Sequence, residues 1–172
     1  MKDIMLDIET LGTLHNSVIT QIGMLYFDRL TGELGKELLV NIRIQDCIDS
    51  GLRVDGGALK FWFEQENKSF LKNPVTLSKA LECVRTFYDK QSLVWAHSTF
   101  DFPLLSNAYS VIGQGFALPY RNLRDIRTLV DLSGLEYIKK EDSKDPKTHN
   151  AMEDCKYQVV YCVECFKKLK ER

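Results

Sequence analysis

Four acidic residues and one histidine have the types and the spacing that hydrolytic chemistry needs. Asp7 and Glu9 lie two residues apart at the end of an apolar N-terminal run, Asp101 follows a second apolar run, and Asp154 comes five residues after His149. Carboxylate oxygen is the ligand that hard divalent cations prefer, and an imidazole titrates near neutral pH. The set indicates a site that holds two divalent metal ions and activates water against a phosphodiester.

The pair Asp7 and Glu9 is predicted to project from one face of a strand. Residues two apart on a strand share a face, with their Cα atoms roughly 7 Å apart. Two carboxylates on one face of an apolar strand repel each other and resist burial, and a divalent metal would neutralise them. The alternative is that both side chains extend into solvent from a fraying strand end.

Asp101 follows a predicted buried strand at residues 92–96 and opens a predicted helix. An aspartate in this place is commonly the N-cap of the helix, which is the alternative interpretation. In open α/β sheets, however, ligands gather beyond the carboxyl ends of the strands. Asp7, Glu9 and Asp101 lie at one such edge if the first and fourth strands are neighbours.

His149 and Asp154 cannot share one face of a helix. Five helical residues advance about 500°, so the two side chains would point roughly 140° apart. We therefore expect His149 just before or at the start of the last helix, on a mobile loop, and Asp154 one turn inside, facing the sheet edge. Taken singly, each could also be an ordinary surface residue.

Hydrophobic patterns predict an antiparallel meander followed by helices and parallel strands. Apolar or alternating runs predict strands at residues 4–6, 18–27, 38–45 and 92–96, with a short strand before Asp125; apolar repeats at three and four residues predict helices near 59–63, 77–88, 104–112, 126–130 and 151–166. Asp125 is expected to cap its helix and Gly134 to close it. The fold class is α/β, a mixed five-stranded sheet flanked by helices.

Bulk properties are those of an ordinary globular protein. The 172 residues are expected to form a single domain, 1–172, and the net charge of −1 offers no global basic field for coating long nucleic acid. An enzyme that grips a few terminal nucleotides remains compatible with this charge. The five cysteines are interpreted as reduced thiols of a cytoplasmic protein, and neither a signal peptide nor a membrane span is expected.

The motifs occur in the order D-x-E, F-D and H-x-x-x-x-D, and in this the chain resembles the DEDDh 3′→5′ exonucleases of the DnaQ-like, ribonuclease-H-like superfamily. The resemblance covers nearly the whole chain. Residues 58–65 and 100–105 look most like the phage-type exonuclease and exoribonuclease-like branch. The resemblance implies a ribonuclease-H-like sheet and an enzyme that releases nucleoside 5′-monophosphates from the 3′ ends of single-stranded DNA or RNA.

The resemblance also implies a role for each residue of the set. Asp7, Glu9, Asp101 and Asp154 would hold two Mg²⁺ or Mn²⁺ ions, and His149 would be the general base. This agrees with the physical preferences of hard cations for carboxylates and with proton transfer by an imidazole at neutral pH.

Contacts with the substrate are expected next to the first motif. By resemblance, Thr10 and Leu11 would touch the terminal nucleotide. Trp62 and Phe63 could stack a base, although core packing is the better interpretation of Trp62. The polar segment 136–148 contains four lysines that could attract phosphates, but interleaved acidic residues are more typical of a solvated loop. A homodimer is an expectation that rests on relatives alone.

Two other functions compete with the exonuclease. A ribonuclease-H-like endonuclease uses similar carboxylates but lacks the H-x-x-x-x-D ending, so His149 favours the exonuclease. A non-catalytic nucleic-acid-binding module could keep the same fold, but all five chemical positions are filled in this chain.

Overall fold

A five-stranded mixed sheet organises the chain. The computed structural model describes residues 2–136 and 149–171, and the strand order is β3-β2-β1-β4-β5. The strands are β1 (Asp3–Thr10), β2 (Ile19–Phe27), β3 (Leu34–Asn41), β4 (Leu93–Ala96) and β5 (Leu123–Asp125). The first three form an antiparallel meander, whereas β4 pairs parallel with β1 and β5 pairs parallel with β4. The predicted mixed sheet is confirmed.

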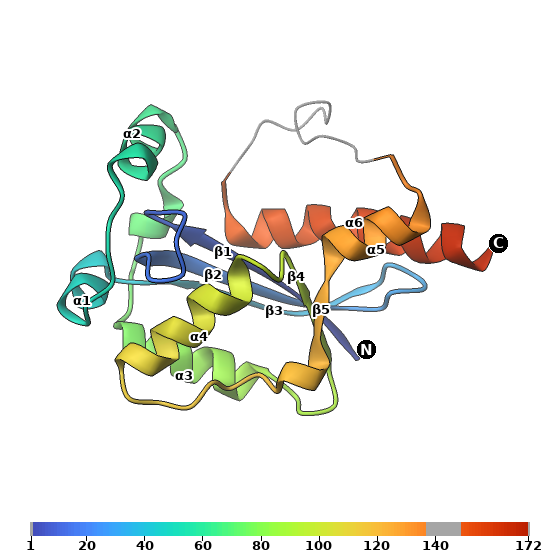
Figure 1. Cartoon of the computed structure of the whole chain (residues 1–172), viewed down its shortest axis with the longest axis horizontal. Helices are drawn as coiled ribbons and strands as arrows, with labels where there is room; N and C mark the ends of the chain where they lie inside the picture. The colour runs from blue at the N-terminus through green and yellow to red at the C-terminus, as the bar shows by residue number, and fades with distance from the viewer. Residues whose placement is uncertain (1, 137–148, 172) are drawn as a thin grey trace.

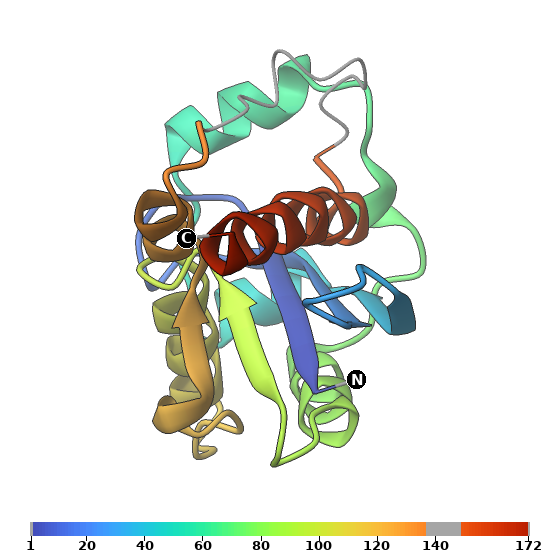
Figure 2. The ribbon, with the colours of Figure 1, turned by 90° about the vertical axis from the view of Figure 1, so that its right-hand side faces the viewer.

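Helices cover both faces of this sheet (Figures 1 and 2). They are α1 (Ile44–Asp49), α2 (Gly56–Glu64), α3 (Leu77–Phe87), α4 (Asp101–Val111), α5 (Ile126–Ser133) and α6 (Ala151–Lys170), with short 3₁₀ turns η1 (Ser69–Leu71) and η2 (Tyr120–Asn122). Figure 2 shows α6 lying across one face and α3 and α4 lying against the other.

The central strand β1 contributes to two hydrophobic cores. Ile4, Leu6 and Ile8 face the core that contains α3 and α4 residues, whereas Met5 faces the core built with α5 and α6. Successive side chains on a strand point to opposite faces, so Asp7 lies on the same face as Met5, toward α6. This alternation places the first acidic residue under the last helix.

The carboxyl ends of the neighbouring strands β1 and β4 lie at the same end of the sheet. In the parallel pair of β1 and β4, Met5 lies opposite Trp95, so both strands run toward the edge where Glu9 and Asp101 follow. The expectation that the first and fourth strands are neighbours is thus confirmed. Residues from three distant parts of the sequence can converge there.

The predicted third strand, 38–45, was wrong at both ends. β3 spans Leu34–Asn41, and Ile44 already begins α1. Ile42, beyond the end of the strand, forms an isolated bridge with Val75, and the buried Cys47 of α1 packs its thiol against the backbone of β2. The alternating apolar pattern in the sequence extends past Asn41, where the strand ends, and this extended the predicted strand too far.

Local capping predictions were confirmed. Asp125 is the N-cap of α5 and accepts a hydrogen bond from the backbone N–H of Thr128, and Gly134 closes the helix with φ 63°. Asp101, in contrast, is not a cap: Phe100 occupies the N-cap position of α4 and Asp101 is the first helical residue. The carboxyl group of Asp101 is therefore available for another role.

Several expectations concern other parts of the chain. All five cysteines are free thiols, as predicted. Among the described residues, no helix combines the length and the apolar character that crossing a membrane requires. The lysines predicted to lie in a loop at residues 137–148 fall outside the described residues.

Candidate metal centre

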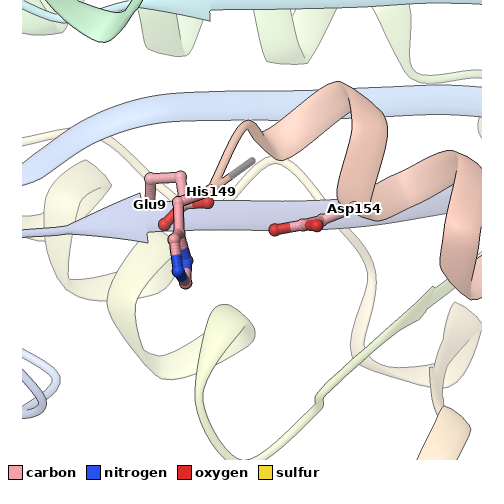
Figure 3. Close-up of side chains that lie close together, drawn as sticks. All are labelled: Glu9, His149 and Asp154. Atoms are coloured by element: carbon pink, nitrogen blue, oxygen red, sulfur yellow. The ribbon is translucent and has the colours of Figure 1, made fainter. Parts of the chain in front are cut away.

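Glu9, His149 and Asp154 meet at the carboxyl end of β1 (Figure 3). Each offers a ligand atom, and these three atoms lie within 4.8 Å of one another. Glu9 comes from β1, His149 lies two residues before α6, and Asp154 lies in the first turn of that helix. All three side chains are half-buried, so the cluster is shielded but reachable from solvent.

Asp7 and Asp101 are more deeply buried members of the acidic group. Asp101 is 1% exposed and accepts a hydrogen bond of 2.9 Å from the backbone N–H of His97. Burial and the negative charge of Asp7 raise the pKa of the Asp101 carboxyl well above its usual range. Asp7 is 9% exposed and accepts a hydrogen bond of 2.7 Å from the Nε2 of Gln158 on α6.

The buried thiol of Cys155 lies close enough to three of the acidic residues to be affected by their charges. Burial raises the pKa of this thiol well above its usual range, and the negative charges of Asp7, Asp101 and Asp154 raise it further. Three carboxylates therefore act on one buried atom. Crowded negative charge in a poorly solvated place favours binding of a cation.

The donor set fits a hard divalent cation. It offers carboxylate oxygens and one imidazole nitrogen, and the 4.8 Å that spans Glu9, His149 and Asp154 is about twice the 2.0–2.6 Å of a metal–oxygen bond to Mg²⁺ or Ca²⁺. The buried pair of Asp7 and Asp101 supplies negative charge that a cation would neutralise. The structure thus brings all five predicted residues to one sheet edge.

His149 lies just ahead of α6, as predicted. The helix begins at Ala151 with Asn150 as its N-cap. The imidazole packs edge-on against two aromatic rings of α2, with centroid distances of 4.7 Å to Phe61 and 5.9 Å to Trp62. The ring is therefore located by contacts with another element as well as by its own backbone.

A pocket of about 400 Å³ adjoins the cluster, and Glu9 and Thr10 are among its lining residues. Leu11, the other predicted substrate contact, is 3% exposed within the hydrophobic core, and its contact with a nucleotide stays a prediction. The core packing of Trp62 is confirmed, because the ring is 4% exposed and its Nε1 donates to the carbonyl of Thr10 at 2.8 Å.

The sequence interpretation named Phe63 and missed Phe61. Phe63 is 77% exposed, whereas Phe61 lines the pocket together with Ala58 and Trp62. Helical spacing could have found Phe61, because residues three and four positions after Ala58 fall on the same side of α2. Phe63 is not among the residues that line the pocket.

His97 lies behind the cluster. Burial, and then the charge of Arg127, lower the pKa of His97 to about 4, so the imidazole is neutral at pH 7. Its Nε2 lies 3.4 Å from the hydroxyl oxygen of Tyr161. His97 thus contributes to the site through its backbone N–H, which holds Asp101.

Comparison with known proteins places this chain in a family. The family model described as the 3′-5′ exoribonuclease Rv2179c-like domain matches residues 2–166. No curated protein sequence matches the chain significantly.

Solved structures of exonuclease I resemble the chain in fold. Exonuclease I from Methylocaldum szegediense is 14% identical with a TM-score of 0.70, over 99% of this chain and 40% of that chain. The zinc-bound E. coli ExoI–ssDNA complex is 12% identical with a TM-score of 0.72, over 99% and 41%. The E. coli Exonuclease I complex with a dT13 oligonucleotide is 13% identical with a TM-score of 0.66, over 97% and 40%.

The chain therefore spans about 40% of the length of these exonuclease I proteins. At such low identity the likeness shows a shared fold, here the ribonuclease-H-like exonuclease fold. The family model covers nearly the whole chain, with the motif residues inside the match. This chain belongs to the 3′-5′ exoribonuclease Rv2179c-like domain family.

Proposed function

We propose that the chain is a metal-dependent 3′→5′ exonuclease that shortens single-stranded nucleic acid and releases nucleoside 5′-monophosphates. The observation that carries the proposal is the meeting of Glu9, His149 and Asp154 in one cluster with the buried carboxyl groups of Asp7 and Asp101. The family description, a 3′-5′ exoribonuclease domain, supports the same activity.

The four carboxylates are the proposed ligands of two Mg²⁺ or Mn²⁺ ions. Two such ions, when bound, stabilise negative charge on the attacking and the leaving oxygens of a phosphodiester. Asp7 and Asp101 are held by hydrogen bonds from Gln158 and from the backbone of His97, so their orientation is fixed in advance. Preorganised ligands of this kind lower the cost of binding.

His149 is the proposed general base. Its imidazole lies among the ligand atoms of Glu9 and Asp154, where it can take a proton from an attacking water. An imidazole with a pKa near neutrality is suited to accept that proton at physiological pH and to release it afterwards.

The adjoining pocket is the proposed binding site of the terminal nucleotide. Two aromatic side chains that are partly exposed, Phe61 and Phe100, are among its lining residues, and aromatic rings stack on any base. RNA is the substrate that we favour because the family is described by its exoribonuclease activity. The oligonucleotide complexes of exonuclease I make single-stranded DNA the alternative to assay. A homodimer stays a prediction.

The test follows the shortening of 5′-labelled single-stranded RNA and DNA with Mg²⁺, with Mn²⁺ or with a chelator. We expect stepwise shortening from the 3′ end, and none with the chelator. His149→Ala should lower kcat by about 100-fold or more, the usual contribution of a positioned base. His15→Ala, which removes an exposed histidine, is the matched control and should keep full activity.

Each contradicting outcome points to a different function. Internal cuts would indicate an endonuclease. Binding of single strands without cleavage at saturating metal would indicate a non-catalytic module. Full activity in His149→Ala would remove the histidine from the mechanism.

A further inference from the structure

The backbone of His149, two residues before the first residue of α6, has an unusual conformation. His149 has φ 41°, in the left-handed region that a residue with a side chain seldom adopts. This conformation is strained for a residue with a side chain and persists where surrounding contacts fix it. The contacts that fix it can be traced through the described residues.

Ala151 rests directly on β2. Its backbone N–H donates a hydrogen bond of 2.7 Å to the Oε1 of Gln21, a side chain that is 1% exposed. Two residues along the strand, a Cβ added at Gly23 would lie 2.6 Å from the carbonyl carbon and oxygen of Ala151. The start of α6 is therefore in backbone contact with the sheet, without room for a side chain between them.

Gln21 is itself held from β3. Its Nε2 donates to the Oδ1 of Asn41 at 2.7 Å. The Nδ2 of Asn41 donates in turn to the carbonyls of Ser69 at 3.1 Å and Lys72 at 2.6 Å, at the η1 turn. In both Gln21 and Asn41 the amide oxygen accepts a hydrogen bond and the amide nitrogen donates one. Each side-chain amide therefore has one favoured orientation.

A second path from the same segment reaches the same turn. Asn150 caps α6 by accepting from the backbone N–H of Met152 at 3.0 Å, and its Nδ2 donates to the Oγ of Ser69 at 3.1 Å. The two paths close a ring of hydrogen bonds that runs from Ala151 through Gln21, Asn41 and Ser69 to Asn150. We call this ring the amide network.

The imidazole is held on its other side by α2. Phe61 and Trp62 contact the ring of His149, and the Nε1 of Trp62 donates to the carbonyl of Thr10, the neighbour of Glu9. The amide network fixes the backbone after the histidine, and the two aromatic rings fix its side chain. Together these contacts fix the position of His149 relative to β1.

We propose that Gln21 and Asn41 are positioning residues of the reaction. Through the amide network they hold the backbone of His149 to Ala151, and so place the imidazole beside Glu9 and Asp154 before substrate binds. The proposal rests on the proposed function, in which His149 is the base. Neither residue needs to touch the substrate, and a displacement of roughly 1 Å in a catalytic group can cost about 100-fold in rate.

The test compares two asparagines that make similar contacts in different places. Asn41→Leu breaks the amide network, whereas the control Asn122→Leu removes an amide that donates to Tyr88, Lys90 and Ser92 at the opposite end of the sheet. Both changes should lower the melting temperature. We expect Asn41→Leu and Gln21→Met to lower kcat by about 10- to 100-fold with little change in KM, and Asn122→Leu to keep kcat.

Two measurements separate positioning from loss of stability. Hydrogen exchange at the Ala151 amide should accelerate in Asn41→Leu and Gln21→Met but not in Asn122→Leu. In the His149→Ala background, Gln21→Met should cause no further loss of kcat, because residues that act through one another are not additive. If either substitution prevents folding, Gln21→Asn, which keeps an amide but is one methylene shorter and so withdraws it from Ala151, takes its place.

The proposal is overturned if the Ala151 amide exchanges faster while kcat is unchanged, if its exchange does not change, or if the losses of Gln21→Met and His149→Ala multiply. Failure of the proposed function gives a different result. In that case the wild-type chain does not cleave, or His149→Ala cleaves normally, whatever the exchange of Ala151.

Discussion

Strand β1 carries two buried aspartates on one face, and they are partnered in opposite ways. Asp3, 4% exposed, forms an ion pair with the guanidinium of Arg29 and accepts a hydrogen bond of 2.8 Å from the Nε1 of Trp95. The guanidinium also lies over the rings of Trp95 and Phe166, 5.4 and 5.2 Å from their centroids. The charge of Asp3 is therefore matched by a cation that is itself held in place.

Asp7, four residues later, accepts a hydrogen bond from the side-chain amide of Gln158, and its negative charge raises the pKa of the neighbouring Asp101. An amide can orient a carboxylate without cancelling its charge. The same residue type on the same face is thus ion-paired with Arg29 at one end of β1 and lies near a second buried carboxyl group at the other. A buried carboxyl group whose pKa is raised by burial and by a second carboxylate, as that of Asp101 is, marks a candidate functional site.

The largest expected effect is a difference in exonuclease activity between the Asp7→Asn and Asp3→Asn variants. Asp7→Asn should lower exonuclease activity by at least about 1,000-fold, equivalent to about 4 kcal/mol of transition-state stabilisation. Its melting temperature without metal should be unchanged or higher, because repulsion with Asp101 is removed. Asp3→Asn should keep its activity per folded molecule. Retained activity in Asp7→Asn would erase the distinction.

The next effect separates them by stability. Asp3→Asn should lower the free energy of unfolding by about 3 kcal/mol, because the partly buried Arg29 loses its partner. Urea denaturation measures this loss. Glu82→Gln, which breaks the exposed pair with Lys79, is the control and should cost about 1 kcal/mol or less. A loss in Asp3→Asn no larger than the control's would show that the buried pair is not structural.

The smallest expected effect is the rise in melting temperature that Mg²⁺ causes, which should also differ between the two aspartate variants. Mg²⁺ at 100 times its Kd should stabilise the wild-type chain by about 2.7 kcal/mol, which raises the melting temperature by roughly 5–10 °C. Asp3→Asn should show the same rise and Asp7→Asn much less. Equal rises in all three, measured by thermal denaturation with and without a chelator, would place the metal elsewhere.

The sheet and the acidic residues could be predicted from the sequence because their signals are local. An apolar run ending in Asp7 and Glu9 predicts a buried strand with two carboxylates at its end. The caps at Asp125 and Gly134 likewise depend on residues within one helical turn. Patterns of this kind do not require knowledge of what packs against them.

The supporting contacts could not be predicted because they join distant residues. Gln21 contacts Ala151 across 130 positions, and Gln158 contacts Asp7 across 151. No spacing in the sequence identifies such partners. For the same reason His149 was expected to lie on a mobile loop. In the structure its ring packs against α2, and the two residues that follow it are held by hydrogen bonds to β2 and η1.

Burial of the cysteines has a consequence for chemical reactivity. The thiolate is the form that alkylating agents and oxidants attack, and burial raises the pKa of Cys47 to about 11 and that of Cys155 well above its usual range. Cys155 also donates its S–H to the carbonyls of Met5 and Gly23, directly beneath the acidic cluster. The thiol beside the acidic cluster is therefore protonated at neutral pH, and its oxidation offers no ready route to disturbing the neighbouring carboxylates.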